Sequence, residues 1–262
     1  MHAPQNLLQI KGMNMLKKIL VAGISSFLGG NVLAGEMGVY EPNLSLDWTA
    51  IISLSGGPAW TSPGREQNFY SSLTSINEHF IADKKSSTLG TGEIYFGLQH
   101  SISSTLAGQF GVGFAAASAI PLSGMVDFNG VANVTTYRYK VSPVRAEFKG
   151  KLIATNYRML QPYLSASLGV GFNHSYQYFP TSINSTLYPP SFFTDQSNVT
   201  FAYTVGAGIQ KMITPNWQVG VGYEFADWGE SSLAGDGKFF RNGPSLPHLY
   251  TNELLFSLSY LF

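Results

Sequence analysis

Apolar and polar side chains alternate with a period of two along most of the chain after residue 44. Successive side chains of a β-strand point to opposite faces of its sheet, so this period predicts strands with one apolar face. The final segment, residues 250–262, shows the pattern most clearly. Its apolar or aromatic positions are Leu254, Phe256, Leu258, Tyr260 and Phe262, and mostly small or polar residues separate them.

The alternation predicts eight strands. They are expected at about 46–60, 88–102, 105–120, 133–153, 162–172, 199–213, 217–226 and 250–262. Four long and three short connections join them in strict alternation, starting with a long one. In outer-membrane barrels, short turns face the periplasm and long loops face outside. We therefore predict an all-β fold, an eight-stranded antiparallel up-and-down transmembrane β-barrel with four long extracellular loops and three short periplasmic turns.

A soluble β-sandwich is the alternative fold, but it explains neither the rhythm of the connections nor the terminal Phe. Aromatic girdles are typical of the two water–lipid interfaces. The residues expected at the periplasmic ends of their strands are Trp48, Trp217, Tyr260 and Phe262. Those expected toward the outer ends are Tyr137, Tyr223, Phe225 and Tyr250.

The strand at about 133–153 changes phase midway, and a β-bulge at Ser142-Pro143 would keep its apolar residues on one face. On that interpretation the barrel lumen collects charges of both signs. The predicted lumen charges are Glu93, Arg138, Lys140, Arg145, Glu147, Lys149, Lys151, Glu224 and Glu253. Because a buried charge is costly unless it is paired, we expect an interior salt-bridge network. A narrow polar path that favours anions is the alternative.

The N-terminal segment has the features of a secretory signal. Lys17 and Lys18 precede the apolar run 19–28, and small or medium residues end at Ala34. We expect cleavage between Ala34 and Gly35. The predicted organisation is therefore an extension with a cleavable signal peptide at 1–34, a short periplasmic lead-in at 35–45 and a barrel domain at 46–262.

The composition fits a protein that hides its surface in lipid. Charged residues are only 11% of the chain, against roughly 25% in soluble domains, and aromatic residues are 14%. After the signal there is no apolar run long enough for a spanning helix, which leaves a β-barrel as the spanning structure. The absence of Cys excludes a lipoprotein anchor and thiolate metal sites. After cleavage the chain has 12 basic and 15 acidic residues, so nothing indicates nucleic-acid binding.

The histidines after the signal do not indicate catalysis. They are His79, His100, His174 and His248. The neighbours Ser101 and Ser175 follow His100 and His174 directly, and adjacent residues of a strand point to opposite faces. No metal-ligand spacing is present either. We expect no enzyme, no metal and no cofactor. A lipid-modifying barrel enzyme is the less favoured alternative, and changes at His100 or His174 would test it.

The signal, the eight strands, the rhythm of the connections and the terminal run 256–262 together resemble small Gram-negative outer-membrane barrels of the OmpA/OmpW/opacity type. The resemblance covers roughly residues 44–262 and is architectural. It implies an outer-membrane location with both termini periplasmic, and a role for the apolar positions of 254–262 as the signal read by the barrel-assembly machinery.

Function follows from the resemblance and the long loops. We expect a non-enzymatic structural or surface-display role, with loops that contact a host surface, a protein partner or lipopolysaccharide. The loop at 174–198 supplies most of the aromatic side chains for such contacts, namely Tyr176, Tyr178, Phe179, Tyr188, Phe192 and Phe193. A narrow porin-like channel or carrier for small solutes is the alternative.

Overall fold

The computed structural model describes residues 48–71, 75–155, 160–183, 192–237 and 240–262. Strands are the only regular elements in these ranges. The same ranges contain no helix of the length and apolarity that crossing a membrane requires. The predicted signal peptide, its cleavage site at Ala34 and Gly35, and the whole predicted lead-in precede the first described residue and lie outside the described residues.

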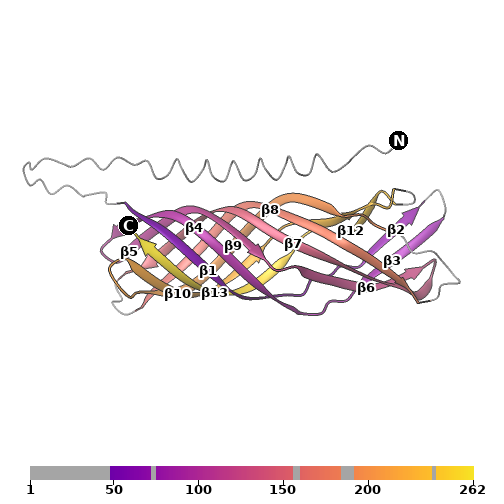
Figure 1. The fold of residues 1–262 in the computed structure, drawn as a ribbon, viewed down its shortest axis with the longest axis horizontal. Coiled ribbons are helices and arrows are strands. Elements are labelled where there is room, and N and C mark those ends of the chain that lie inside the picture. Colours follow the sequence, from indigo (N-terminus) through magenta and orange to yellow (C-terminus); the bar gives the residue numbers. More distant parts are fainter. Residues whose placement is uncertain (1–47, 72–74, 156–159, 184–191, 238–239) are drawn as a thin grey trace, which may run out of the picture. The chain divides into compact units, whose positions relative to one another are not determined.

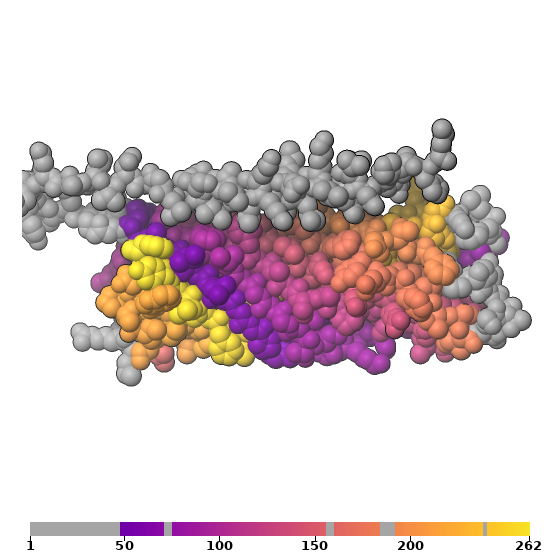
Figure 2. Space-filling view, viewed as in Figure 1, coloured from indigo at the N-terminus to yellow at the C-terminus, as the bar shows by residue number. Residues whose placement is uncertain are grey.

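Eight strands form a closed antiparallel ring. They are β1 (Thr49–Thr61), β4 (Ser87–Ser103), β5 (Leu106–Ala117), β7 (Val131–Ala154), β8 (Gln161–Ser182), β9 (Gln196–Met212), β10 (Trp217–Asp227) and β13 (Tyr250–Leu261). Their order is β7-β5-β4-β1-β13-β10-β9-β8, and β7 also pairs with β8. Figure 2 shows the C-terminal strand, in yellow, beside the indigo β1, where Ile52 pairs with Tyr260. The predicted fold class is confirmed.

Strands occupy parts of all four segments that we expected to be long loops. Three of these segments contain additional strands, namely β2 (Gln67–Ser71), β3 (Ile76–Ala82), β6 (Ile120–Phe128), β11 (Ser231–Ala234) and β12 (Asn242–Leu246). In the fourth, expected at 174–198, β8 itself continues as far as Ser182. The strands β2, β3 and β6 continue the sheet from the edge of the long strand β7, in the order β2-β3-β6-β7. In Figure 1, β2, β3, β6 and β12 lie at the end of the ring opposite the C-terminus. We call this part, with the adjoining ends of β7 and β8, the extension.

The β6–β7 hairpin shows why these segments were taken for loops. Asn129 and Gly130 both have positive φ values, 44° and 83°, as a tight hairpin turn requires. The sequence analysis treated this dipeptide as part of a loop between ring strands. It is in fact the turn between two long strands of the extension.

The predicted β-bulge at Ser142-Pro143 is wrong. β7 and β8 pair in unbroken register from Val141 opposite Ser175 to Ile153 opposite Tyr163. The register shifts before this stretch, between Arg138 and Lys140. One face of β7 therefore runs straight through the position where the sequence pattern changes phase.

The phase change marks a change of environment. In the ring, the outward side chains are apolar and exposed, such as Phe148 at 75% and Leu168 at 61%. In the extension, the apolar side chains of β7 turn inward. Tyr137, Tyr139 and Val141 are buried there. This inward cluster, the extension core, also contains Ile76, Phe80, Leu89, Ile120, Leu122, Val126, Phe193, Leu233, Phe240, Leu246 and Leu249.

Candidate functional site

The lumen of the ring holds an ionic cluster of two cations and four carboxylates. Arg145, which has no exposed surface, lies at its centre. Its guanidinium is 2.8 Å from both Glu147 and Glu224, and farther from two more carboxylates. Those longer contacts are with Glu253 at 3.5 Å and with Glu93 at 3.8 Å. A buried guanidinium is tolerable because these partners compensate its lost hydration.

Lys149 completes the cluster. Its ammonium lies 2.6 Å from Glu93, 2.7 Å from Glu224 and 3.6 Å from Glu147. Oxygens of the same three carboxylates lie within 4.8 Å of one another, a spacing that could hold a metal ion. The ammonium is placed among them instead, so this donor set already has its cation. The geometry is that of an internal salt bridge.

The four carboxylates outnumber the two cations, and hydroxyl groups donate additional hydrogen bonds to two of these carboxylates. Ser167 donates to Glu147 at 2.9 Å, and Thr251 donates to Glu253 at 2.6 Å. Thr91 makes a longer bond to Glu253 at 3.3 Å. These small polar residues alternate with apolar ones along the ring strands, and the same alternation that predicts the strands delivers them to the lumen.

Trp228 covers the cluster on the side of the extension. Its ring lies over the Arg145 guanidinium at 4.2 Å, and its indole N–H donates to Thr251 at 2.8 Å. Asn173, itself buried, donates to the backbone carbonyls of Trp228 and Glu230, both at 2.8 Å. The segment that follows β10 is thereby folded into the barrel mouth. Sequence reasoning missed Trp228, because it lies in a stretch that reads as loop.

Beyond Trp228 the interior is the extension core. Aromatic rings fill it, with Phe80 5.2 Å from Tyr137 and Phe193 5.1 Å from Tyr178. Burial, and to a lesser extent the charge of Asp83, raises the pKa of Tyr137 to about 12. Burial also raises the pKa of Tyr178. These phenols stay neutral at physiological pH and behave as core residues.

Toward the other end of the ring, amide pairs and an apolar layer follow the cluster. Gln109 donates to Gln99 at 2.7 Å, and Ile51, Tyr95 and Leu261 pack together nearby. The ammonium of Lys151 lies 4.4 Å from the centre of the Tyr163 ring and forms no ion pair within the described residues. The lumen therefore consists of stacked layers, with the ionic cluster in the middle.

Seven of the nine predicted lumen charges point inward, and six of them form the cluster. Arg138 and Lys140 do not belong to the lumen. Both are exposed on the outer face of β7. The predicted bulge placed them inside, whereas β7 keeps its own alternation here and turns them outward, because the extra residue of the register shift belongs to β8. Tyr137, expected in the outer girdle, likewise lies in the extension core.

The predicted assembly-signal residues all lie on the outward face of β13 or at the C-terminal end, and several are strongly exposed. Aromatic contacts gather at this end of the ring, where Tyr260 lies 5.0 Å from both Trp217 and Phe262. Whether the assembly machinery reads these residues stays a prediction. Of the loop aromatics, Phe192 is 62% exposed, whereas Phe193 and Tyr178 pack into or against the extension core. Tyr188 lies outside the described residues.

The histidines make local contacts with side chains of neighbouring strands and segments. The Nδ1 atom of His174 is 2.9 Å from the hydroxyl of Ser197 on the neighbouring strand, a pair that sequence adjacency did not suggest. No carboxylate contact to His174 is found among the described residues. His248 is bonded to the buried carboxylate of Asp227 at 2.7 Å. His100 stacks on Trp48 at 4.6 Å.

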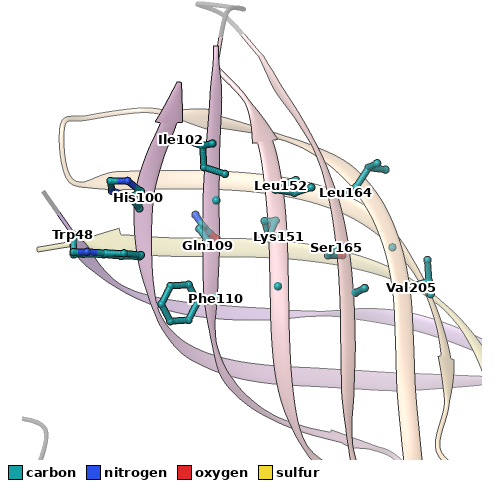
Figure 3. Close-up of a pocket in the computed structure, with 14 residues that line it drawn as sticks. Trp48, His100, Ile102, Gln109, Phe110, Lys151, Leu152, Leu164, Ser165 and Val205 are labelled. Carbon is teal, nitrogen blue, oxygen red and sulfur yellow. The ribbon is translucent and has the colours of Figure 1, made fainter. Parts of the chain in front are cut away.

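An apolar groove of about 570 Å³ runs across the outer face of β4, β5, β7, β8 and β9 (Figure 3). Gly108 and Gly150 are among its lining residues, and a Cβ at Gly150 would have no neighbour closer than 4.0 Å. Phe110 and Leu164 are among its walls. The groove is a shallow part of the apolar exterior.

No family model and no curated protein sequence matches the chain. Among solved structures, the chain is similar to OprG of Pseudomonas aeruginosa, an outer membrane protein, at 14% identity and a TM-score of 0.41, over 81% of this chain and 95% of OprG. The chain is also similar to Neisserial surface protein A, at 14% identity and a TM-score of 0.39, over 82% of this chain and 97% of that protein. A third similar structure is Ail, the attachment invasion locus protein of Yersinia pestis, at 11% identity and a TM-score of 0.33, over 82% of this chain and 97% of Ail. The strand pairing by itself makes this chain an eight-stranded antiparallel β-barrel, the architecture that its sequence predicts.

Proposed function

We propose that the protein is a non-enzymatic integral barrel of the outer membrane, sealed in its lumen, whose extension and loops are presented outside the cell. The proposal rests on one observation above all. The side chains that cover the outside of the ring are apolar, while its inside is polar and charged. A soluble barrel would have the reverse arrangement, since apolar surface in water is unfavourable.

The sealed lumen follows from the layers inside it. Arg145 and Trp228 have no exposed surface, and the Trp228 ring lies over the Arg145 guanidinium at 4.2 Å on the side of the extension. A continuous water path would have to separate Arg145 from four carboxylates and displace a tryptophan from a packed core. Both steps are costly. These contacts favour surface display over the alternative of a porin-like channel or carrier.

The display role is supported by the construction of the extension. It has its own apolar core, so its strands form a rigid platform beneath the remaining loops. Its partners are proposed to be lipopolysaccharide and, through the loops, a host surface or another protein. The chain termini of the ring lie at the opposite end and are proposed to face the periplasm.

Single-channel conductance tests the sealed lumen. The folded barrel in a planar bilayer is expected to give no discrete openings, because the cluster and Trp228 block the lumen. The variant Arg145→Ala with Trp228→Ala, which removes both, is expected to conduct and serves as a control for insertion. Steady openings of the unaltered protein, with an ion selectivity that changes in Lys149→Gln, would establish the channel in place of the sealed barrel.

A further inference from the structure

Two cationic side chains lie on the outer surface of the barrel, where the apolar exterior of the ring ends on the side of the extension. Arg138 and Lys140 are exposed on the outer face of β7, and Lys140 pairs across the sheet with Tyr176 of β8. His174 is exposed two residues before Tyr176 on the same face of β8. We call Arg138, Lys140, His174 and Tyr176 the rim patch.

The cross-strand rows of side chains on the ring side of the rim patch show where it lies along the barrel. Val144 of β7, Phe172 of β8 and Val199 of β9 lie in one cross-strand row and are exposed and apolar. The next row in the direction of the extension is entirely polar. It consists of Ser142, His174 and Ser197. The boundary between apolar and polar exterior therefore crosses three strands at one level, and the rim patch begins at that level.

The charges of the rim patch have no ionic partner within the described residues. The Arg138 guanidinium lies 4.8 Å from the centre of the Phe179 ring, which supports one of its faces. Lys140 forms no ion pair in the same ranges. Two carboxylates come from adjoining segments, and both are otherwise engaged. Asp83 pairs with Lys85 at 3.1 Å, and Asp195 accepts a bond from the Gln177 amide at 3.1 Å.

The polar neighbours of the two cations are held in place. The Ser142 hydroxyl is bonded to the Tyr176 hydroxyl at 3.3 Å, and His174 to Ser197 at 2.9 Å. The rings of His174 and Tyr176 stack at 5.3 Å, with 11° between their planes. Stacked rings at the water–lipid boundary give the flexible cations a fixed polar and aromatic border.

We propose that the rim patch binds the phosphate of a lipid headgroup in the outer leaflet. This rests on the proposed function, since only in a membrane does the apolar row below the patch face acyl chains. A lipid whose chains lie against Val144, Phe172 and Val199 brings its headgroup to the height of Arg138 and Lys140. A guanidinium presents paired N–H donors to phosphate oxygens, and a nearby ammonium adds charge. The phosphorylated sugars of lipid A have this combination of acyl chains and phosphate.

The test measures binding of lipid A to the purified full-length barrel, folded in detergent micelles. The probes are bisphosphorylated lipid A and the same lipid without phosphates, each scored by the retained complex in native mass spectrometry. Arg138→Gln with Lys140→Gln is expected to weaken binding of the phosphorylated lipid roughly tenfold to thirtyfold, and to leave binding of the dephosphorylated lipid unchanged. Arg65→Gln with Lys84→Gln removes the same charge from exposed loop positions and is expected to leave both unchanged.

Equal loss in the two double variants would overturn the proposal, because the effect would then be one of net charge. Competition by millimolar inorganic phosphate would also overturn it, since the site would then take a free anion without its acyl chains. Insertion into phospholipid vesicles, scored by protease protection, separates the two proposals. A barrel that inserts but shows no phosphate-dependent binding contradicts only the rim patch. A barrel that does not insert contradicts the membrane assignment itself.

Discussion

Arg145 is surrounded by four carboxylates and an indole ring, and none of its surface reaches solvent. Its neighbours alternate along β7 with outward apolar residues, so one strand supplies both the charged interior and the apolar exterior. A buried ion cluster of this kind contributes less through net attraction than through the penalty that follows when one member is lost. Removing the central cation leaves the carboxylates facing one another.

We expect Arg145→Met to lower the free energy of unfolding by about 3–5 kcal/mol, because it leaves four buried carboxylates with Lys149 as their single cation. Urea unfolding of the folded barrel in lipid vesicles, followed by tryptophan fluorescence, measures the change. Lys151→Met is the matched control from the same strand and face. Its ammonium lies over Tyr163 without an ion pair in the described residues, so the expected loss is below about 1 kcal/mol. Equal losses in the two variants would show that the cluster does not behave as a unit.

At the scale of the element, the segment between β10 and β13 depends on a few buried polar contacts. Asn173 on β8 donates to two of its carbonyls, and the backbone N–H of Trp228 donates to the Leu249 carbonyl at 2.9 Å. The turn at Gly229 has a φ of 81°, and its N–H donates to Asp227 at 2.8 Å. This segment is folded as part of the barrel mouth, although its composition is that of a loop.

Asn173→Ala is expected to loosen this segment, because two buried carbonyls lose their donor at a cost of about 1–3 kcal/mol. Hydrogen exchange of residues 228–234 should become faster, while the ring strands β1 and β4 keep their protection. Asn68→Ala, on the exposed face of β2, is the control and should change neither region. Unchanged exchange at 228–234 in Asn173→Ala would mean that packing alone holds Trp228 in place.

The ring strands could be predicted from the sequence because their alternation is long and each lies in one environment. Strand β6 and the hairpin β2–β3 could not, since Pro121 and Gly124 interrupt the first and Glu78 breaks the apolar alternation of the second. The charges near the middle of the barrel were placed correctly by parity alone. Parity alone would have put Arg138 and Lys140 on the outer face, but the expected bulge moved them inside, because we assumed that the apolar face of this strand points outward along its whole length.

At the scale of the whole molecule, the ring and the extension are two opposite solutions to burial within one closed sheet. The ring exposes apolar side chains outward and packs charges inside, whereas the extension packs apolar side chains inside. The strands β7 and β8 belong to both parts, so each carries an apolar exterior at one end and an apolar interior at the other.

A single strand can therefore report both environments. Leu168→Arg, at the middle of the ring portion of β8, is expected to cost about 2–4 kcal/mol when the barrel unfolds from a bilayer, because it places a charge in hydrocarbon. Thr181→Arg, exposed on the extension portion of β8, is expected to change stability by less than about 0.5 kcal/mol. Urea titration in vesicles compares the two. Similar small costs for both would place the ring exterior in water.

With the ring in a bilayer, as proposed, the alternation of β7 also fixes how deeply the barrel sits in that bilayer. If the barrel moved along the membrane normal by the spacing of two residues, one direction would bring Lys140 toward the hydrocarbon. The opposite direction would bring Val144 into water. The barrel has little freedom to slide along the membrane normal. In a thicker or thinner bilayer, the lipid around β7 and β8 would have to stretch or thin to meet this boundary, while the protein kept its position.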